Sequence, residues 1–300
     1  MMKKTSNVSF SKLSNFTALT GRVVVIGSSG FVGHEVLNLL SATGINILGV
    51  GRSDVDLVSP MAKSYFEKVI SDGDTVVFTA ADVPVKSLHQ FENNLLMLNY
   101  FLEGTRGKRL KHLIYISSDG VFADSEKPLH EHSLRGSQNL HGLMHTVREI
   151  TLESSSFQDV LCIVRPTIIY GARDPHNSYG PCLFMRLALK NEDIVLFGKG
   201  EERRDFIHVT DVAKIITEVA QMGIVGSLNA VSGEVHSFFE LAHLILEITK
   251  SKVNIVSKPR NGKMPHDGYR PFDTSNLCLA LPLFSQNSIK MGMELMYQGR

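Results

Sequence analysis

Short apolar runs rich in Val, Ile and Leu alternate with segments of helical periodicity from Arg22 onward. RVVVIG has the length and composition of a buried strand, and FVGHEVLNLLSATG carries apolar residues at three- and four-residue steps. The same pattern predicts strands at residues 22–27, 46–51, 74–80, 112–117 and 160–166, and helices at 31–44, 59–73, 90–104 and 139–149. Because continuous apolar strands separated by helices form parallel sheets covered on both faces, we expect an α/β fold with a doubly wound parallel sheet.

Three glycines at three-residue intervals mark the first strand–helix junction, in VVVIGSSGFVG. Gly27 would permit the tight turn, Gly30 would let the backbone approach a pyrophosphate, and Gly33 would let the helix lie close to the strand. The helix N-terminus would then face the anion. A glycine triplet alone is weak evidence, but this one stands where a Rossmann dinucleotide site requires it. The residues expected to bind the dinucleotide are Gly27, Ser29, Gly30, Phe31, Val32, Gly33, Ala80 and Ala81.

The end of the second strand bears on which dinucleotide is bound. NAD-preferring sites place a carboxylate there for the ribose hydroxyls, whereas this sequence has Gly51 followed by Arg52, with no acid apparent at the strand end. A guanidinium favours a 2′-phosphate, so we expect NADP, with NAD as the alternative. Otherwise Arg52 would be a solvated loop charge. Asp56 would either hydrogen-bond the adenine or cap the next helix.

The chain changes character after Pro166. Loops lengthen, Gly and Pro become more frequent, and the alternation of strand and helix loosens. We expect a dinucleotide-binding domain at 21–166, with 206–222 packing back on it, and a smaller C-terminal lobe, mainly substrate-binding, at 167–300. Residues 1–20 contain lysines but no continuous apolar segment, so we expect a loosely held leader rather than a signal peptide.

Composition narrows the class of protein. A hydrophobic content of 43% and a charged content of 20% suit a folded domain with an ordinary core. The net charge is +1 and basic residues are scattered, so we expect no nucleic-acid partner. No apolar run approaches the roughly 20 residues that span a bilayer, so we expect no membrane segment. The widely spaced Cys162, Cys182 and Cys278 fit reduced thiols in a cytoplasmic protein.

Further motifs follow the glycine turn in a familiar order, and they are GSSGFVG, YISSDGVF, RPTIIYG, YGPCLFMR, RRDFIHVTDVA and GSLNAVSGEVHSFFELA. From about Arg22 to at least Asp273, the chain resembles the extended short-chain dehydrogenases/reductases. These are NAD(P)-dependent nucleotide-sugar epimerases, dehydratases and 4-ketosugar reductases. The resemblance implies a nucleotide-sugar substrate between the two lobes, with the dinucleotide across the C-terminal edge of the sheet.

The resemblance implies catalytic roles just after the fourth strand. The family's catalytic Ser/Thr falls on Ser118, whose hydroxyl would bond the reacting sugar oxygen; the alternative is a turn that closes the strand. Asp119 matches the aspartate that follows this position in the dehydratases. Their next residue is a proton-abstracting glutamate, and here it is Gly120. This difference argues against dehydration and favours simple redox chemistry or epimerisation.

Residues of the later motifs are implied to line the cofactor and the sugar. Arg165, Pro166 and Thr167 of RPTIIYG would lie beside the nicotinamide. Asn177 and Tyr179 resemble residues that line the sugar or its diphosphate. By the same resemblance, these residues would connect the cofactor domain to the substrate lobe.

Two arginines are implied to hold the nucleotide phosphates. Arg204 of RRDF stands where the family grips them, and Arg270 of HDGYRPFD is the expected second clamp. Two guanidiniums that converge on a diphosphate form strong, charge-assisted bidentate contacts. For each arginine, the alternative is a plain salt bridge.

Two histidines occupy the positions of the family's signature pair. In the family, a tyrosine carries the proton, and a lysine four residues later lowers the tyrosine pKa and binds the nicotinamide ribose. Counted from Ser118, these positions are His141 and His145. An imidazole titrates at about pH 6.5 and can move the proton that accompanies hydride transfer. His145 can still hydrogen-bond a ribose, but without a permanent charge.

Two functions remain open at this point. One is an NAD(P)-dependent oxidoreductase or epimerase acting on a nucleotide-linked sugar, with His141 as proton carrier. The other is a catalytically impaired cofactor- and ligand-binding or regulatory protein on the same fold. A metal site would need a third ligand beyond the histidine pair, so we expect no metal. Related enzymes often pair through helices, so we expect a homodimer, and the compatible apolar residues are Leu95, Leu96, Met97, Leu143 and Met144.

Overall fold

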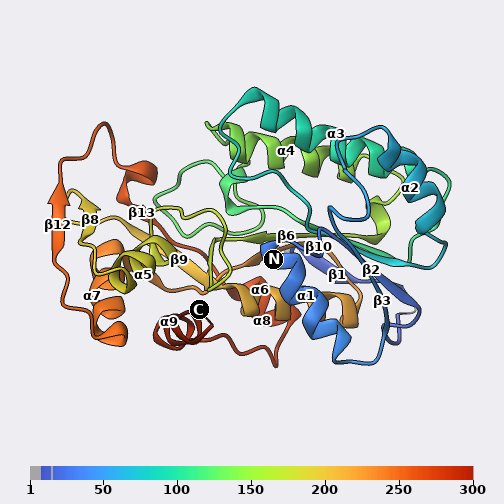
Figure 1. Cartoon of the computed structure of the whole chain (residues 1–300). Coiled ribbons are helices and arrows are strands. Elements are labelled where there is room, and N and C mark those ends of the chain that lie inside the picture. Colours follow the sequence, from blue (N-terminus) through green and yellow to red (C-terminus); the bar gives the residue numbers. More distant parts are fainter. Residues whose placement is uncertain (1–7, 15, 300) are drawn as a thin grey trace, which may run out of the picture.

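Residues 8–14 and 16–299 are described by the computed structural model. Their main feature is a seven-stranded sheet with the strand order β1-β10-β6-β5-β4-β2-β3 (Figure 1). Neighbouring strands are parallel, except that β1 is antiparallel to β10. The bounds are β1 (Phe10–Lys12), β2 (Arg22–Ile26), β3 (Asn46–Val50), β4 (Thr75–Phe78), β5 (His112–Ile116), β6 (Leu161–Pro166) and β10 (Ile224–Ala230).

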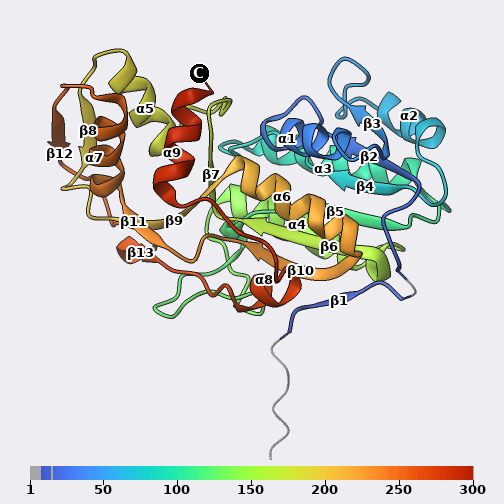
Figure 2. The same ribbon diagram turned by 90° about the horizontal axis from the view of Figure 1, so that it is seen from below.

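Helices cover both faces of this sheet (Figures 1 and 2). One face carries α1 (Phe31–Ser41), α6 (Val209–Met222) and α8 (Ser275–Ala280). The other carries α2 (Met61–Val69), α3 (Leu88–Gly104) and α4 (Leu140–Glu153). The helix expected at 139–149 therefore extends four residues further, to Glu153, and contains both histidines.

The strands contribute side chains to two apolar cores, one on each side of the sheet. In β2, Val23 and Val25 pack in the core with α1 and α6, while Val24 and Ile26 pack in the core with α2 and α3. None of these four side chains is exposed to solvent. A strand buried on both faces needs apolar residues at every position, which explains the unbroken runs in the sequence. The predicted α/β fold with a doubly wound parallel sheet is confirmed.

Two strands of the sheet were not expected there. β10 comes from a part of the chain that was expected mainly in the second lobe, yet it pairs with β6 over residues 226–230. β1 lies within the expected leader and adds an antiparallel edge through the pairs Phe10–Gly226, Ser11–Val225 and Lys12–Ile224. Of the remaining leader, residues 1–7 and 15 lie outside the described part of the chain.

The second lobe lies at the opposite end of the molecule from β3 (Figures 1 and 2). It contains a four-stranded sheet of β7 (Ile168–Tyr170), β9 (Arg203–His208), β11 (Val235–Ser237) and β13 (Tyr269–Arg270). A two-stranded sheet is formed by β8 (Ile194–Phe197) and β12 (Ile255–Lys258). Its helices are α5 (Pro181–Leu189), α7 (Phe238–Thr249) and α9 (Ile289–Gln298).

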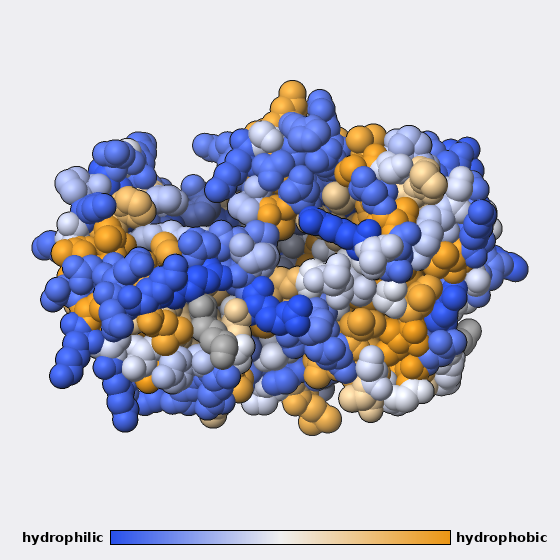
Figure 3. All heavy atoms as spheres, viewed as in Figure 1, coloured by the Kyte–Doolittle hydropathy of each residue, from blue (hydrophilic) through white to orange (hydrophobic). Residues whose placement is uncertain are grey.

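The two lobes are joined where β9 leads directly into α6. α6 packs against α1, and Val212, Ile215 and Ile216 belong to the core under the large sheet. The second lobe has a separate core that includes Phe184 and Phe238. Between the lobes the molecular surface is indented (Figure 3).

Candidate functional site

The turn after β2 depends on its glycines. Gly27 has a φ of +89°, and a Cβ there would lie 2.6 Å from Thr79 Oγ1 and 2.8 Å from Ala80 N. A Cβ on Gly33 would overlap the carbonyl oxygen of Gly27 and lie 2.7 Å from Thr79 Oγ1. β2, α1 and the segment after β4 therefore approach more closely than side chains would allow.

The N-terminus of α1 opens on this turn without a side-chain cap. Gly30 is the N-cap residue with extended backbone, and the first turn contains no acidic residue. The first N–H groups of a helix have no intrahelical acceptor and carry the positive end of its dipole. In α1 these belong to Phe31, Val32 and Gly33. An uncapped helix N-terminus behind a turn that begins and ends with glycine fits the pyrophosphate of a dinucleotide.

Other residues predicted for the cofactor border the same turn. Ser29 is exposed, and its hydroxyl would lie 3.1 Å from a Cβ added to Gly51 at the end of β3. Ala80 and Ala81 are half-buried in the segment that follows β4. The structure thus brings the predicted residues of three segments together at the carboxyl edge of the sheet.

The end of β3 carries both a positive and a negative group. Arg52 is exposed, and it forms no hydrogen bond or ion pair within the part of the chain that the structure describes. Asp54 Oδ2 accepts a hydrogen bond from Gly51 N at 2.7 Å, so the sequence-based expectation of a strand end without an acid is corrected. Asp56 Oδ1 accepts from Val58 N at 3.1 Å, and the N-cap of α2 is Pro60. Asp56 therefore closes a turn rather than caps α2.

Ser118 and His141 both lie next to Gly120. A Cβ on Gly120 would lie 3.3 Å from Ser118 Oγ and 3.5 Å from His141 Cδ2. A Cβ on Gly142 would overlap the carbonyl oxygen of Gly120, so this glycine lets α4 approach the 3₁₀ turn η1 (Asp119–Val121). Ser118 Oγ accepts from Gly120 N at 3.1 Å, which is the turn-closing contact considered above. The hydroxyl of Ser118 in turn donates to Asp119 Oδ1 at 3.5 Å.

His141 is half-buried on the first turn of α4. Burial lowers its pKa below 6.5, the Asp119 carboxylate opposes this shift, and His176 reinforces it. The ring nitrogen Nδ1 is buried and has no hydrogen-bond partner among the described residues. His141 is therefore a neutral imidazole near pH 7, and its buried Nδ1 forms no hydrogen bond among the described residues.

His145 lies one turn deeper, with its ring centroid 4.9 Å from that of His141 in an edge-to-face arrangement. It is 4% exposed, and its Nδ1 lies 2.7 Å from the hydroxyl of Tyr115 on β5. Burial, followed by the proximity of His141 and Arg148, lowers its pKa well below 6.5. His145 thus carries no charge at neutral pH.

Arg148 is fully buried one turn further along α4. Its Nη1 and Nη2 each donate to the carbonyl oxygen of Ala80 at 3.2 Å, and its guanidinium lies over the ring of Tyr115 with Cζ 5.3 Å from the centroid. Burial lowers its pKa from 12.5. A cation at this depth was not expected, because sequence spacing alone did not show that position 148 faces the core.

Arg165 and Thr167, expected beside the nicotinamide, make contacts inside the protein. Arg165 is 3% exposed and forms a bidentate pair with Glu149, with Nε–Oε1 and Nη2–Oε2 distances of 2.8 Å. Thr167 Oγ1 donates to Asp205 Oδ1 at 2.8 Å. Burial raises the pKa of Asp205 to about 6. Pro166 is buried at the end of β6, so these residues hold the sheet edge in place.

The two arginines expected to grip a diphosphate are already paired with carboxylates. Arg204 is 4% exposed, and its Nη2 donates to Glu202 and, at 2.5 Å, to the carbonyl oxygen of Pro265. Burial lowers its pKa. Arg270 is 2% exposed and donates to Asp119 and Asp124. The salt-bridge alternative thus describes the contacts of both side chains.

The two residues expected to line the sugar differ in environment. Asn177 is exposed with a φ of +50°, and its Oδ1 accepts from Arg186 Nη1 at 2.5 Å. The ring of Tyr179 packs against Phe184, Phe197 and Phe238 in the second-lobe core. Its hydroxyl accepts from Phe197 N at 3.1 Å. Tyr179 therefore contributes to packing of the lobe.

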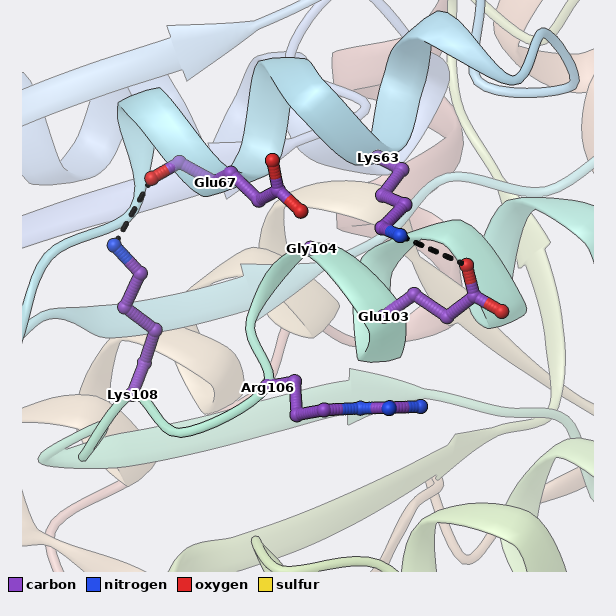
Figure 4. A pocket seen from close by; sticks show the side chains of 6 residues that line it. All are labelled: Lys63, Glu67, Glu103, Gly104, Arg106 and Lys108. Atoms are coloured by element: carbon purple, nitrogen blue, oxygen red, sulfur yellow. Dashed lines mark hydrogen bonds and ion pairs between the residues drawn. The ribbon is translucent and has the colours of Figure 1, made fainter.

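A large cavity lies away from these residues. It has a volume of about 560 Å³ and lies between α2 and the end of α3 (Figure 4). Its lining residues are Lys63, Glu67, Glu103, Gly104, Arg106 and Lys108. Lys63 pairs with Glu103 at 3.9 Å, and Lys108 Nζ donates to the backbone oxygen of Glu67 at 2.9 Å. None of the predicted site residues lines it.

Among the described residues, no group of three or more His, Cys, Asp or Glu side chains is placed to hold a metal ion. No helix among residues 8–14 and 16–299 combines the length and apolarity needed to cross a bilayer.

Comparison with known proteins places the chain in a family. UDP-N-acetyl-alpha-D-glucosaminuronate decarboxylase from Bacillus cytotoxicus is 24% identical over 280 residues, covering 82% of this chain and 85% of that protein. dTDP-4-dehydro-6-deoxy-D-allose reductase from Streptomyces bikiniensis is 26% identical over 262 residues, covering 75% and 80% respectively.

Solved structures share the fold. UDP-glucose 4-epimerase from Thermotoga maritima, solved with UDP-glucose, superposes with a TM-score of 0.82 at 21% identity and covers 93% of this chain and 98% of its own. GDP-L-fucose synthetase from Naegleria fowleri bound to NADP gives a TM-score of 0.83 at 19% identity, with coverage of 98% and 97%. A model of the NAD-dependent epimerase/dehydratase family matches residues 23–229. The predicted resemblance is confirmed: the chain belongs to the NAD-dependent epimerase/dehydratase family.

Proposed function

We propose that the protein is an NADP-dependent oxidoreductase or epimerase that acts on a nucleotide-linked sugar. The observation that carries this proposal is that Ser118 and His141 both lie next to Gly120, at the same edge of the sheet as the glycine turn. The relatives support the substrate class, because their names include a UDP-sugar decarboxylase and a dTDP-sugar reductase. When bound, the nicotinamide would accept or supply the hydride.

His141 is proposed as the proton carrier. As a neutral imidazole it can accept the proton that leaves a sugar hydroxyl during oxidation. In the opposite direction its protonated form returns that proton, so reduction needs the less populated state at neutral pH. Ser118 would orient the same sugar oxygen through its hydroxyl. Gly120 leaves open the space between the two side chains that any larger residue would fill.

The cofactor preference, the oligomeric state and the compartment are part of the same proposal. Arg52 is an exposed cation at the end of β3, which favours the 2′-phosphate of NADP over NAD.

Three apolar side chains on neighbouring helices are exposed and suit a helical homodimer interface. They are Leu96 on α3 and Leu143 and Ile150 on α4, which are 38%, 43% and 50% exposed. Light scattering that finds only monomers at micromolar concentration would remove the dimer. Cys162, Cys182 and Cys278 form no disulfide among the described residues, which suits the cytoplasm.

A second candidate is a binding or regulatory protein that has lost turnover. It is favoured by the charges of the site: His145 is neutral, and Arg204 and Arg270 are each paired with protein carboxylates. Such a protein would bind NADP and a nucleotide sugar without hydride exchange.

Two measurements distinguish these candidates: binding of the nicotinamide cofactor, and then hydride transfer between the cofactor and a sugar nucleotide. Purified protein should show a thermal shift with NADPH or NADH, and the absence of both shifts would end both candidates. If the cofactor binds, deuteride from labelled NADPH should be transferred to C4 of an added 4-ketosugar nucleotide, which gives the deuterated 4-hydroxy sugar nucleotide and NADP⁺. Binding without any transfer across a panel of such sugars would favour the second candidate. In an active protein, His141→Phe should lower turnover about 100-fold or more, and unchanged turnover would remove His141 from the proton path.

A further inference from the structure

Tyr115 and His145 form a buried contact that the proposed reaction does not yet use. Tyr115 is unexposed on β5, and His145 is 4% exposed on α4. The Tyr115 hydroxyl and His145 Nδ1 are 2.7 Å apart, a good hydrogen-bond distance. One of the two atoms must supply the proton, and the surroundings decide which one.

The neighbouring groups make the Tyr115 hydroxyl the donor of the hydrogen bond to His145. Burial raises the pKa of Tyr115, so the hydroxyl keeps its proton. The guanidinium of Arg148 lies over the same ring and has only donors, so it cannot accept that proton. Ser117, two residues along β5, donates its own hydroxyl proton to Glu149 Oε1 at 2.6 Å. His145 Nδ1 is the acceptor placed within 2.7 Å.

The same surroundings keep the imidazole neutral. A neutral ring whose Nδ1 accepts a hydrogen bond carries its proton on Nε2. Nε2 lies on the opposite edge of the ring from Nδ1 and makes no hydrogen bond within the described residues. Arg148, in contrast, keeps a permanent charge, and its guanidinium forms no ion pair with a carboxylate in the described part of the chain. It donates to Ala80 O and, at 3.5 Å, to Asn94 Oδ1, and its interaction with the Tyr115 side chain opposes the lowering of its pKa by burial.

We propose that Tyr115 and Arg148 are positioning residues that hold His145 as the neutral Nε2–H tautomer. Position 145 is thereby an uncharged hydrogen-bond donor through Nε2. The positive charge that a lysine would bring to position 145 comes instead from Arg148, one helical turn further on. The role of this donor in turnover rests on the proposed function, whereas the tautomer is a property of the protein alone.

The tautomer can be measured without cofactor or substrate. In protein labelled with ¹⁵N-histidine, long-range ¹H–¹⁵N correlation separates protonated from unprotonated ring nitrogens, and His145→Gln identifies the His145 signals. At pH 7 we expect an unprotonated Nδ1 and a protonated Nε2. A protonated Nδ1 of His145 in the native protein would overturn the proposal, and the His145→Gln variant serves only to assign the signals.

Tyr115→Phe removes the donor and keeps the ring. We expect its His145 signals to move toward a mixture of both tautomers, and an unchanged spectrum would contradict the role of Tyr115. Tyr170→Phe is the matched control, because it removes another buried phenol hydroxyl that lies beside His208 in the second lobe. Its His145 signals should stay in place. Arg148→Met, which removes the charge, should raise the pH at which His145 takes up a second proton; an unchanged or lower titration point would contradict the role of Arg148.

The outcomes separate this proposal from the proposed function. If no nicotinamide cofactor binds, the proposed function fails, and the tautomer measurement stands unaffected. If turnover is found, Tyr115→Phe should lower kcat by up to about 10-fold with a smaller change in KM for the sugar, as expected for the loss of one hydrogen bond that orients a donor. Equal turnover in Tyr115→Phe and native protein would separate the tautomer from catalysis and overturn the positioning role.

Discussion

Arg270 Nε donates a hydrogen bond to Asp119 Oδ2 at 3.0 Å, and Arg270 Nη2 donates to the backbone oxygen of the same aspartate at 2.8 Å. The resemblance assigned these two residues to different tasks, phosphate binding and catalysis. Asp124 Oδ1 accepts a further bond from Arg270 Nη1 at 3.1 Å. The charge of Arg270 is therefore shared with two carboxylates before any anionic ligand arrives.

Replacing one of these carboxylates should strengthen the binding of a diphosphate. Asp119→Asn keeps an oxygen that can accept from Arg270 but removes a negative charge that competes with the ligand. Lowering this repulsion by about 1 kcal/mol would tighten UDP binding about fivefold, which titration calorimetry can measure. Asp72→Asn is the control, since Asp72 pairs with the exposed Arg109 at 3.6 Å outside the site. Unchanged or weaker UDP binding in Asp119→Asn would mean that Arg270 does not meet the diphosphate.

Glu149 and Arg165 form a buried ion pair, and replacing one partner should strongly lower the free energy of unfolding. Glu149 is unexposed and accepts hydrogen bonds from Arg165, Ser117 and Arg135. Glu149→Gln leaves a buried guanidinium without its countercharge, which costs about 3–5 kcal/mol. Urea denaturation measures this loss. Glu153→Gln is the matched control, because Glu153 also pairs with Arg135 but is 39% exposed, so about 1 kcal/mol or less is expected. Similar losses in both variants would refute the account.

The close approach at the glycine turn predicts different costs for two glycines. Gly33→Ala would force its new methyl group onto the Gly27 carbonyl oxygen, which is backbone and cannot rotate away. We expect a loss of unfolding free energy of about 2 kcal/mol or more. Gly51→Ala is the comparison: the nearest atom, Ser29 Oγ at 3.1 Å, ends a side chain that can rotate, so the loss should stay within about 1 kcal/mol. Equal losses would show that the turn can relax around Gly33.

Most of the large sheet could be predicted because its strands are buried on both faces and therefore read as unbroken apolar runs. β10 escaped prediction because its sequence, IVGSLNA, contains Gly226, Ser227 and Asn229 within the run. β1 is only three residues long, and its place at the sheet edge depends on backbone pairing with β10, which leaves no periodicity in the sequence. These two strands are defined by tertiary contacts.

In the candidate site too, some features could be predicted from the sequence and others could not. The glycine turn and the two histidines were found from the sequence because a local structure, a tight turn or one turn of a helix, determines their spacing along the chain. The partners of the charged side chains were not found, since Arg270 and Asp119 are 151 positions apart and Tyr115 and His145 are 30 apart. Nothing local in the sequence specifies that such residues meet.

Arg52 provides a test of the cofactor preference. Arg52→Ala removes an exposed guanidinium that has no ion-pair partner in the described structure, so the fold should be unaffected. Loss of a charge-assisted contact of about 1.5–3 kcal/mol would weaken NADPH binding about 10-fold to 100-fold. NADH lacks the 2′-phosphate, and its affinity should change by less than about twofold. Fluorescence titration of both cofactors measures the two effects, and equal losses would show that Arg52 never meets the 2′-phosphate.

Three buried histidines predict a loss of stability in mild acid. Burial lowers the pKa of His112 and of His208 from 6.5 to about 4, and lowers that of His145 well below 6.5. Below pH 6.5 the unfolded chain therefore binds protons that the folded chain excludes, so this contribution is complete above pH 6.5 and declines as the pH falls toward 4. Each histidine should reduce the unfolding free energy by up to about 1.4 kcal/mol per pH unit in that window. Urea denaturation between pH 7 and pH 5 measures how the free energy of unfolding changes with pH.

His112→Gln keeps a donor for the Ile224 carbonyl oxygen that His112 contacts at 2.8 Å. This variant should make the slope of unfolding free energy against pH shallower by the contribution of one histidine. His89→Gln, at an exposed position on α3, should leave the slope unchanged, and equal slopes in all three proteins would refute the assignment to His112.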